Sequence, residues 1–197
     1  MEGAPGAGER LKGKVRHMSE TSMKRQMHEA QAEGNDQDAH MGMYMTFKSG
    51  NEYFGLKIQY VSEIIQFQTI TAIPETEDYI KGLINLRGKV IPVIDVRLRF
   101  KQQPFEYNDR TCIIVINVKN MLVGLIVEKI AEVVDIREEN ILPPPKIGRN
   151  EKAHNKYVYG IGKVGDSVKL LLDPDKLLND EDLTVVEQAN DMSSEEE

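Results

Sequence analysis

Short runs of apolar and β-branched residues, separated by turn-forming residues, recur through the middle of the chain. Such runs are typical of strands rather than helices because they are short and either alternate in polarity or are β-branched throughout. Pro92 falls inside one run and predicts an edge position or a bulge, since proline cannot donate a hydrogen bond to a ladder. The predicted strands are residues 44–48, 53–58, 90–94, 111–117, 122–127 and 168–172.

Helical signals are few and short. Residues 59–65 and 173–178 each have the length of about one helical turn. The strongest helix prediction is residues 180–188, where acidic residues at the start favour the helix macrodipole and Leu183 and Val186 share one face. The pattern therefore predicts an all-β protein with short helices and a C-terminal helix.

The same spacing pattern occurs twice along the chain. In each copy a Gly-Leu pair is followed by a glutamate eight residues after the glycine; further on, a glycine precedes an aspartate by 13 residues. An ordered match of two blocks favours a duplicated unit over coincidence. About five short strands per copy suit a small barrel, so we expect two barrels side by side with a docking groove at their seam. The matching residues are Gly55, Glu63, Gly82 and Asp95 in the first copy and Gly124, Glu132, Gly160 and Asp173 in the second.

Charge and aromatic content divide the chain into three regions. Residues 1–42 carry a net charge of −1, residues 43–179 carry +2 and residues 180–197 carry −8. All 12 aromatic residues fall within 43–179. Residues 1–42 are predicted to be a flexible extension because they lack the apolar area that offsets the entropy of ordering. Residues 180–197 then form the helix and an acidic tail.

The same composition excludes several classes of function. The nearly neutral middle region argues against a nucleic-acid groove, which needs clustered positive charge. The sequence contains no membrane-length apolar run and no secretion signal, so no membrane insertion is expected. One cysteine is typical of a reducing compartment. We therefore expect a cytoplasmic protein.

Candidate chemistry is sparse, and no catalytic residue, metal site or cofactor is predicted. Cys112 begins a predicted strand and is expected to act as a small apolar residue. Residues 160–165 fit the dinucleotide fingerprint Gly-x-Gly-x-x-Gly, but that motif must open a helix and here precedes an apolar strand. An enzyme that uses a small ligand or nucleotide at the Gly160 loop or Cys112 remains the alternative hypothesis.

Arg87 stands out because the run around it, residues 82–88, is otherwise largely apolar. Either it is a hairpin charge in solvent or the partner of an acid such as Asp95, or it is a fixed guanidinium on a docking surface, where arginine is enriched. Composition alone does not decide between these interpretations.

The segment from Tyr79 to Arg97, with Asn85-Leu-Arg87-Gly88 as its most specific block, closely resembles the signature of the CheW family of bacterial chemotaxis coupling proteins. Residues 107–109 and 173–178 also fit, and the resemblance covers about residues 43–189. It implies two intertwined five-stranded SH3-like barrels. It also implies a non-catalytic adaptor that joins chemoreceptor cytoplasmic tips to the regulatory domain of the histidine kinase CheA, recruited to membrane-associated receptor arrays.

The resemblance also implies two contact faces. The receptor face is expected at the seam between the barrels, where Gly82 would let a helix approach the backbone and Arg87 would supply a directional donor. The kinase face is expected on the first barrel, where Phe67 would serve as an aromatic anchor. The predicted receptor-binding residues are Val61, Gly82, Arg87 and Val133, and the predicted kinase-binding residues are Glu63 and Phe67.

Overall fold

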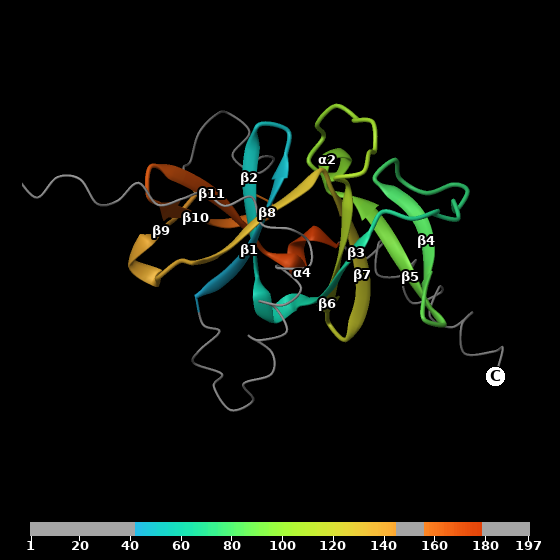
Figure 1. Ribbon diagram of the computed structural model, residues 1–197, viewed down its shortest axis with the longest axis horizontal. Helices are drawn as coiled ribbons and strands as arrows, with labels where there is room; N and C mark the ends of the chain where they lie inside the picture. The colour runs from blue at the N-terminus through green and yellow to red at the C-terminus, as the bar shows by residue number, and fades with distance from the viewer. Residues whose placement is uncertain (1–41, 145–155, 179–197) are drawn as a thin grey trace, which may run out of the picture.

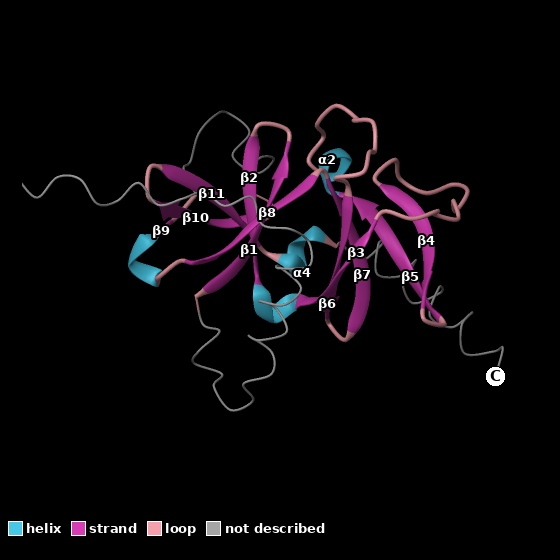
Figure 2. Ribbon diagram, in the orientation of Figure 1, coloured by secondary structure: helices cyan, strands magenta, loops and turns pink. Residues whose placement is uncertain are grey.

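The computed structural model describes residues 42–144 and 156–178. The predicted extension, apart from its last residue, lies outside these ranges, as do the predicted helix 180–188 and the acidic tail. The described chain forms two β-sheets side by side, with α4 near their junction (Figure 1). Its helices are short and strands predominate (Figure 2), as the sequence pattern predicts.

The first sheet has six strands in the order β8-β1-β2-β11-β10-β9. Its strands are β1 Met43–Ser49, β2 Glu52–Lys57, β8 Lys129–Asp135, β9 Ile141–Leu142, β10 Val158–Val164 and β11 Ser167–Leu172. The second sheet has five strands in the order β3-β6-β7-β5-β4. Its strands are β3 Val61–Gln66, β4 Ile80–Leu86, β5 Lys89–Asp95, β6 Cys112–Val118 and β7 Met121–Val127. The helices are η1 Ile58–Tyr60, α2 Val96–Arg99, η2 Glu138–Asn140 and α4 Pro174–Leu177.

The two sheets have the same strand order, and each contains strands from both copies of the repeat. The strand order of one sheet becomes that of the other when five pairs of strands are exchanged, with β9 left over. The pairs are β1 with β6, β2 with β7, β3 with β8, β4 with β10 and β5 with β11. The hairpin β1–β2 joins strands of the second copy, whereas β6–β7 joins strands of the first copy. The duplication and the intertwined architecture are therefore confirmed, and each copy crosses between the sheets directly after its Gly-Leu block.

Glycines lie where the two copies pair. Strand β2 pairs in parallel with β11 at Gly55↔Leu171, and β7 pairs with β5 at Gly124↔Val93. A Cβ atom on Gly124 would lie 2.8 Å from Cγ2 of Ile113 and 3.2 Å from Cγ2 of Val93. Such distances are too short for carbon atoms in a packed core, so a side chain at this point would crowd both neighbours of β7, which are β6 of the same copy and β5 of the other.

Two local predictions need correction. The helical turn predicted over 59–65 is wrong beyond residue 60, because the β-branched residues that follow pair with β6 as strand β3. Of the two alternatives predicted from Pro92, the edge position is wrong, since β5 lies between β4 and β7, whereas a bulge does occur in the β4–β5 ladder. Pro92 is accommodated because the ladder with β7 starts at the next residue, opposite a bulge in β4. Within the described residues, no backbone ladder joins the two edges of either sheet.

The hydrophobic core has three parts. One cluster is shared by both sheets, and it includes Phe47 and Leu56 from the first and Ile64 and Ile114 from the second. A smaller cluster belongs to the second sheet and another to the first. Because the largest cluster spans the junction, neither sheet can be removed without exposing the other's apolar surface.

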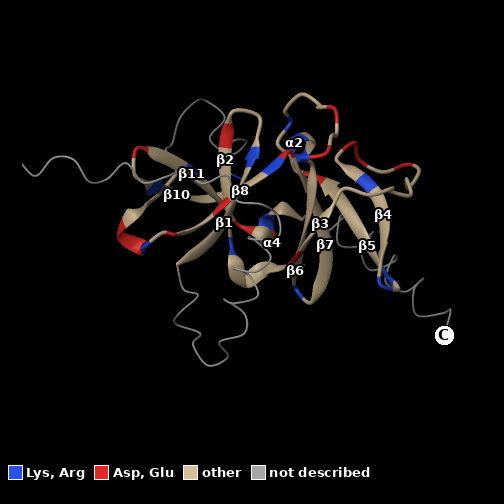
Figure 3. Cartoon of the chain, in the orientation of Figure 1, with Lys and Arg blue, Asp and Glu red and all other residues tan. Residues whose placement is uncertain are grey.

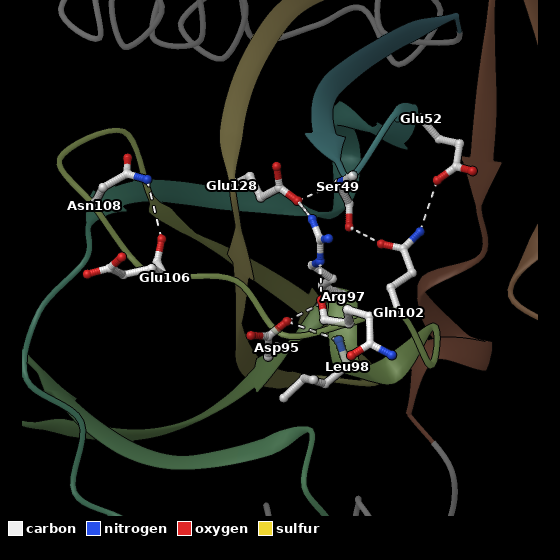
Figure 4. Close-up of polar contacts among 11 residues, drawn as sticks. Ser49, Glu52, Asp95, Arg97, Leu98, Gln102, Glu106, Asn108 and Glu128 are labelled. Atoms are coloured by element: carbon white, nitrogen blue, oxygen red, sulfur yellow. Dashed lines mark hydrogen bonds and ion pairs between the residues drawn. The ribbon is translucent and has the colours of Figure 1, made fainter.

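A polar network ties the β1–β2 turn of the first sheet to the segment after α2 (Figure 4). The carboxylate of Glu128 accepts hydrogen bonds from the Gly50 N–H, at 2.6 Å, and from the Arg97 guanidinium. The hydroxyl of Ser49 donates to Oε1 of Gln102 at 3.0 Å, and Nε2 of Gln102 donates to Glu52 at 2.9 Å. These contacts set the position of one sheet relative to the other at the rim of the shared core.

Arg99 lies buried at the junction, with 6% of its surface exposed. Its guanidinium carbon lies 4.2 Å from the ring centre of Tyr79 and 5.0 Å from that of Tyr157, and its Nε donates to the carbonyl of Leu177 at 2.8 Å. Tyr79 and Tyr157 occupy equivalent places, since their carbonyls accept from the N–H groups of Asp95 and Asp173. The Arg99 guanidinium therefore contacts two equivalent tyrosine rings, one from each copy.

We predict that Arg99→Ala lowers the free energy of unfolding by about 2–4 kcal/mol, because a desolvated cation–π contact and a charged hydrogen bond are both lost. Arg99→Lys keeps the charge but not the planar donor, and should lose about 1–2 kcal/mol. Chemical denaturation measures both. Arg110→Ala, at an exposed arginine, is the control and should be neutral. An equally small effect of Arg99→Ala would show that the junction does not depend on this cation.

Candidate partner-binding face

Arg87 and Glu63 form an ion pair between the two edges of the second sheet. Arg87 lies in the β4–β5 turn with a φ of +54°, and Glu63 lies on β3. Nη2 of Arg87 lies 2.8 Å from Oε2 of Glu63, and Nη1 donates to Oε1 at 3.3 Å. The structure thus joins a predicted receptor residue to a predicted kinase residue. Asp95, the acid suggested as a partner for Arg87, lies elsewhere and caps α2.

The pair remains open to solvent on its cationic side. The Arg87 side chain is 78% exposed, whereas that of Glu63 is 26% exposed. Solvent screening leaves little stabilisation in such a pair. Its main effect is orientation: the carboxylate restrains an exposed guanidinium that can also donate to an incoming group.

Gly82 is closed off by the chain itself. It lies on β4 with a φ of +131°, and a Cβ there would lie 2.0 Å from the carbonyl oxygen of Thr71. Thr71 pairs with the neighbouring Leu83 through two backbone hydrogen bonds of 2.9 and 2.8 Å. The close approach for which Gly82 was singled out is therefore made by the connection between β3 and β4.

Val61 and Val133 both contribute to the core cluster shared by the two sheets. Val61 begins β3 and is 3% exposed, so its side chain acts through packing and not through direct contact. Val133 lies on β8 opposite Met45 and is partly buried. The structure therefore brings these two predicted residues into one cluster at the junction.

Phe67 directly follows β3 and is half-buried against the core of the second sheet. Its ring centre lies 4.6 Å from that of Tyr107. The Tyr107 hydroxyl donates to Oδ2 of Asp95 at 2.7 Å. Burial, together with this hydrogen bond, raises the pKa of the Tyr107 phenol well above its ordinary value, so Tyr107 stays a proton donor. The sequence assigned no role to Tyr107 beyond its place in the family resemblance, because nothing in the local pattern indicates which ring it contacts.

The structure does not support the enzyme hypothesis. The glycine motif lies in β10 and in the turn to β11, so no helix N-terminus follows it to receive a pyrophosphate. Cys112 begins β6, and its thiol lies 3.3 Å from the Arg110 carbonyl and donates to it. Neither place carries the geometry that nucleotide binding or nucleophilic catalysis requires.

Charges are distributed over the described surface without a basic stripe. Figure 3 shows acidic and basic residues on both sheets. None of the described helices is long and apolar enough to cross a membrane. An exposed arginine held by Glu63 and a half-buried phenylalanine ring are side chains typical of a protein–protein interaction module.

Comparisons with known proteins identify which module it is. The chain belongs to the CheW family, because the model of the CheW-like domain matches residues 43–182. Chemotaxis protein CheW of Klebsiella aerogenes is 35% identical over 144 residues, which are 73% of this chain and 86% of that protein. Chemotaxis protein CheW of Treponema pallidum is 31% identical over 143 residues, covering 71% and 83%.

A solved structure supports the same assignment. The crystal structure of the scaffolding protein TtCheW from Thermoanaerobacter tengcongensis matches with a TM-score of 0.65 and 34% identity, over 72% of this chain and 94% of that chain. The chain is therefore a chemotaxis scaffold protein, a non-catalytic adaptor, as its sequence predicts.

We predict that the Glu63–Arg87 pair contributes less than about 1 kcal/mol to folding, because the guanidinium is exposed. A double-mutant cycle of Glu63→Gln and Arg87→Gln, followed by chemical denaturation, measures the coupling free energy. The coupling should fall further in high salt. A salt-independent coupling above about 2 kcal/mol would mean that this pair holds the sheet edges together.

Proposed function

We propose that this adaptor couples the cytoplasmic tips of chemoreceptors to the regulatory domain of the histidine kinase CheA, in the cytoplasm at membrane-associated arrays. Membership of the CheW family supports the proposal. The observation that carries it is the presence of two different contact groups on the second sheet. One is an exposed arginine oriented by Glu63, and the other is the half-buried ring of Phe67, four residues further along from Glu63.

The receptor face in this proposal consists of Val61, Gly82, Arg87 and Val133. Arg87 makes the direct contact, because its guanidinium is exposed and held at the tip of a turn. Gly82 acts indirectly by letting Thr71 lie against β4. Val61 and Val133 support the junction from the shared core. A receptor helix that presents a carboxylate or carbonyl oxygen to Arg87 suits this surface.

We predict that Arg87→Ala weakens binding to a receptor cytoplasmic fragment about tenfold or more, because a charged hydrogen bond contributes about 1.5–3 kcal/mol. Affinity for CheA and the melting temperature should stay nearly unchanged. The matched control is Lys89→Ala, which removes an exposed cation two residues away on the same hairpin. Equal losses in receptor and CheA binding would contradict the assignment of Arg87 to a separate receptor face.

The kinase face consists of Glu63 and Phe67. Half-buried aromatic rings are frequent anchors of protein interfaces because they bury a large rigid area on binding. Phe67 meets this description, and its position beyond the end of β3 leaves part of the ring accessible.

We predict that Phe67→Ala weakens binding of the CheA regulatory domain by about 1–3 kcal/mol, as measured by titration calorimetry. The control is Phe100→Ala, which removes a partly buried ring packed on the shared core. That variant should lose stability while its folded fraction keeps its affinity for CheA. If Phe67→Ala behaves in the same way as Phe100→Ala, Phe67 is a core residue and the kinase face lies elsewhere.

A further inference from the structure

We propose that Tyr107 is a positioning residue for the CheA contact: it holds the Phe67 ring in its binding orientation through a hydrogen bond to the buried carboxylate of Asp95. This inference rests on the kinase face proposed above and names the group that controls it. Neither Tyr107 nor Asp95 needs to touch the kinase for the mechanism to operate.

Regular backbone pairing does not hold either ring in place. The ladder of β3 with β6 ends at Gln66↔Cys112, one residue before Phe67. Tyr107 lies in the irregular segment between α2 and β6. The ring centres of Phe67 and Tyr107 lie 4.6 Å apart with an interplanar angle of 45°. Phe105 packs edge-on against Tyr107, with 5.1 Å between the ring centres. Their orientation therefore depends on side-chain contacts.

The hydrogen bond to Asp95 gives this cluster a rigid base. Asp95 is 1% exposed, and its Oδ1 accepts from the N–H groups of Arg97 and Leu98 at 2.8 and 3.1 Å. The carboxylate is thus held by the first turn of α2, and its Oδ2 accepts from the Tyr107 hydroxyl at 2.7 Å. A charge-assisted bond to a buried, immobile acceptor restricts the tyrosine ring, and the tyrosine ring in turn restricts Phe67.

The second copy of the fold serves as an internal comparison. Asp173 is the equivalent of Asp95 and likewise caps its helix, accepting from the Asp175 N–H at 3.2 Å. Its Oδ2 pairs with a local lysine, Lys176, at 3.0 Å instead of with a tyrosine. The position equivalent to Phe67 is Ile136, which is buried. Both described copies therefore use the cap, but only the aspartate beside the proposed contact ring accepts a hydrogen bond from a tyrosine.

The test compares two tyrosine hydroxyls in the full chain. Tyr107→Phe keeps the ring and removes the bond to Asp95. Tyr159→Phe is the matched control, because its hydroxyl also makes a partly buried hydrogen bond, at 2.6 Å to Tyr44 in the first sheet. We expect Tyr107→Phe to weaken CheA binding about threefold to tenfold and to leave receptor binding unchanged. Tyr159→Phe should leave both affinities unchanged even where it costs comparable stability.

A double-mutant cycle shows whether Tyr107 acts through Phe67. In a Phe67→Ala background, Tyr107→Phe should change the affinity for CheA by less than about 1.5-fold, because no ring remains to be positioned. Each Tyr→Phe variant labelled with 4-fluorophenylalanine gains one resonance, so the Phe67 resonance is identified in each by its loss on adding Phe67→Ala; it should shift in Tyr107→Phe and not in Tyr159→Phe. Full additivity in the cycle, or an unchanged Phe67 resonance, would overturn the positioning role.

The outcomes separate this inference from the proposed function. If Phe67→Ala weakens CheA binding and Tyr107→Phe does not, the positioning role is wrong and the kinase face stands. If Phe67→Ala leaves CheA binding intact, both are wrong, because Tyr107 then has no binding ring to position.

Discussion

The close parallel contact between the two copies, at Gly55 and Gly124, is the constraint on which the rest of the structure depends. Each sheet is complete only when a hairpin from one copy pairs beside the last strand of the other. Gly124 lies between β5 of the other copy and β6 of its own copy, with no room for a Cβ. The shared core forms as a consequence, and residues far apart in sequence become neighbours. The second sheet, which carries the proposed contact faces, is therefore built by both halves of the chain.

Arg99 lies where equivalent residues of the two copies meet. Arg99 and the residue whose carbonyl it binds, Leu177, are 78 positions apart, which is also the separation of Asp95 from Asp173. Arg99 thus contacts its own counterpart and lies between the equivalent rings of Tyr79 and Tyr157. A second buried arginine at the equivalent position would lie beside the first and repel it, whereas Leu177 is uncharged.

Local pattern and repeated spacing were enough to predict strands β1, β2, β5, β6, β7 and β11, the duplication, and a strand rather than a helix after the glycine motif. They were not enough for β3, because Val61 to Gln66 is short and its strand form depends on pairing with β6, nearly fifty residues away. The contact of Glu63 with Arg87 was equally hidden. It exists only because the second sheet curves and brings its two edges together, and curvature is not encoded in any local run of residues.

The differences between the copies separate what the fold requires from what it does not require. Equivalent bulges at Gly82 and Gly160, equivalent caps at Asp95 and Asp173, and equivalent crossovers after each Gly-Leu block are needed twice because the architecture is built twice. The half-buried ring of Phe67 has buried Ile136 as its counterpart. Exposed Arg87 has a glycine turn residue as its counterpart. The architecture therefore does not demand these two side chains, and their exposure on one sheet alone makes that sheet the better candidate for partner recognition.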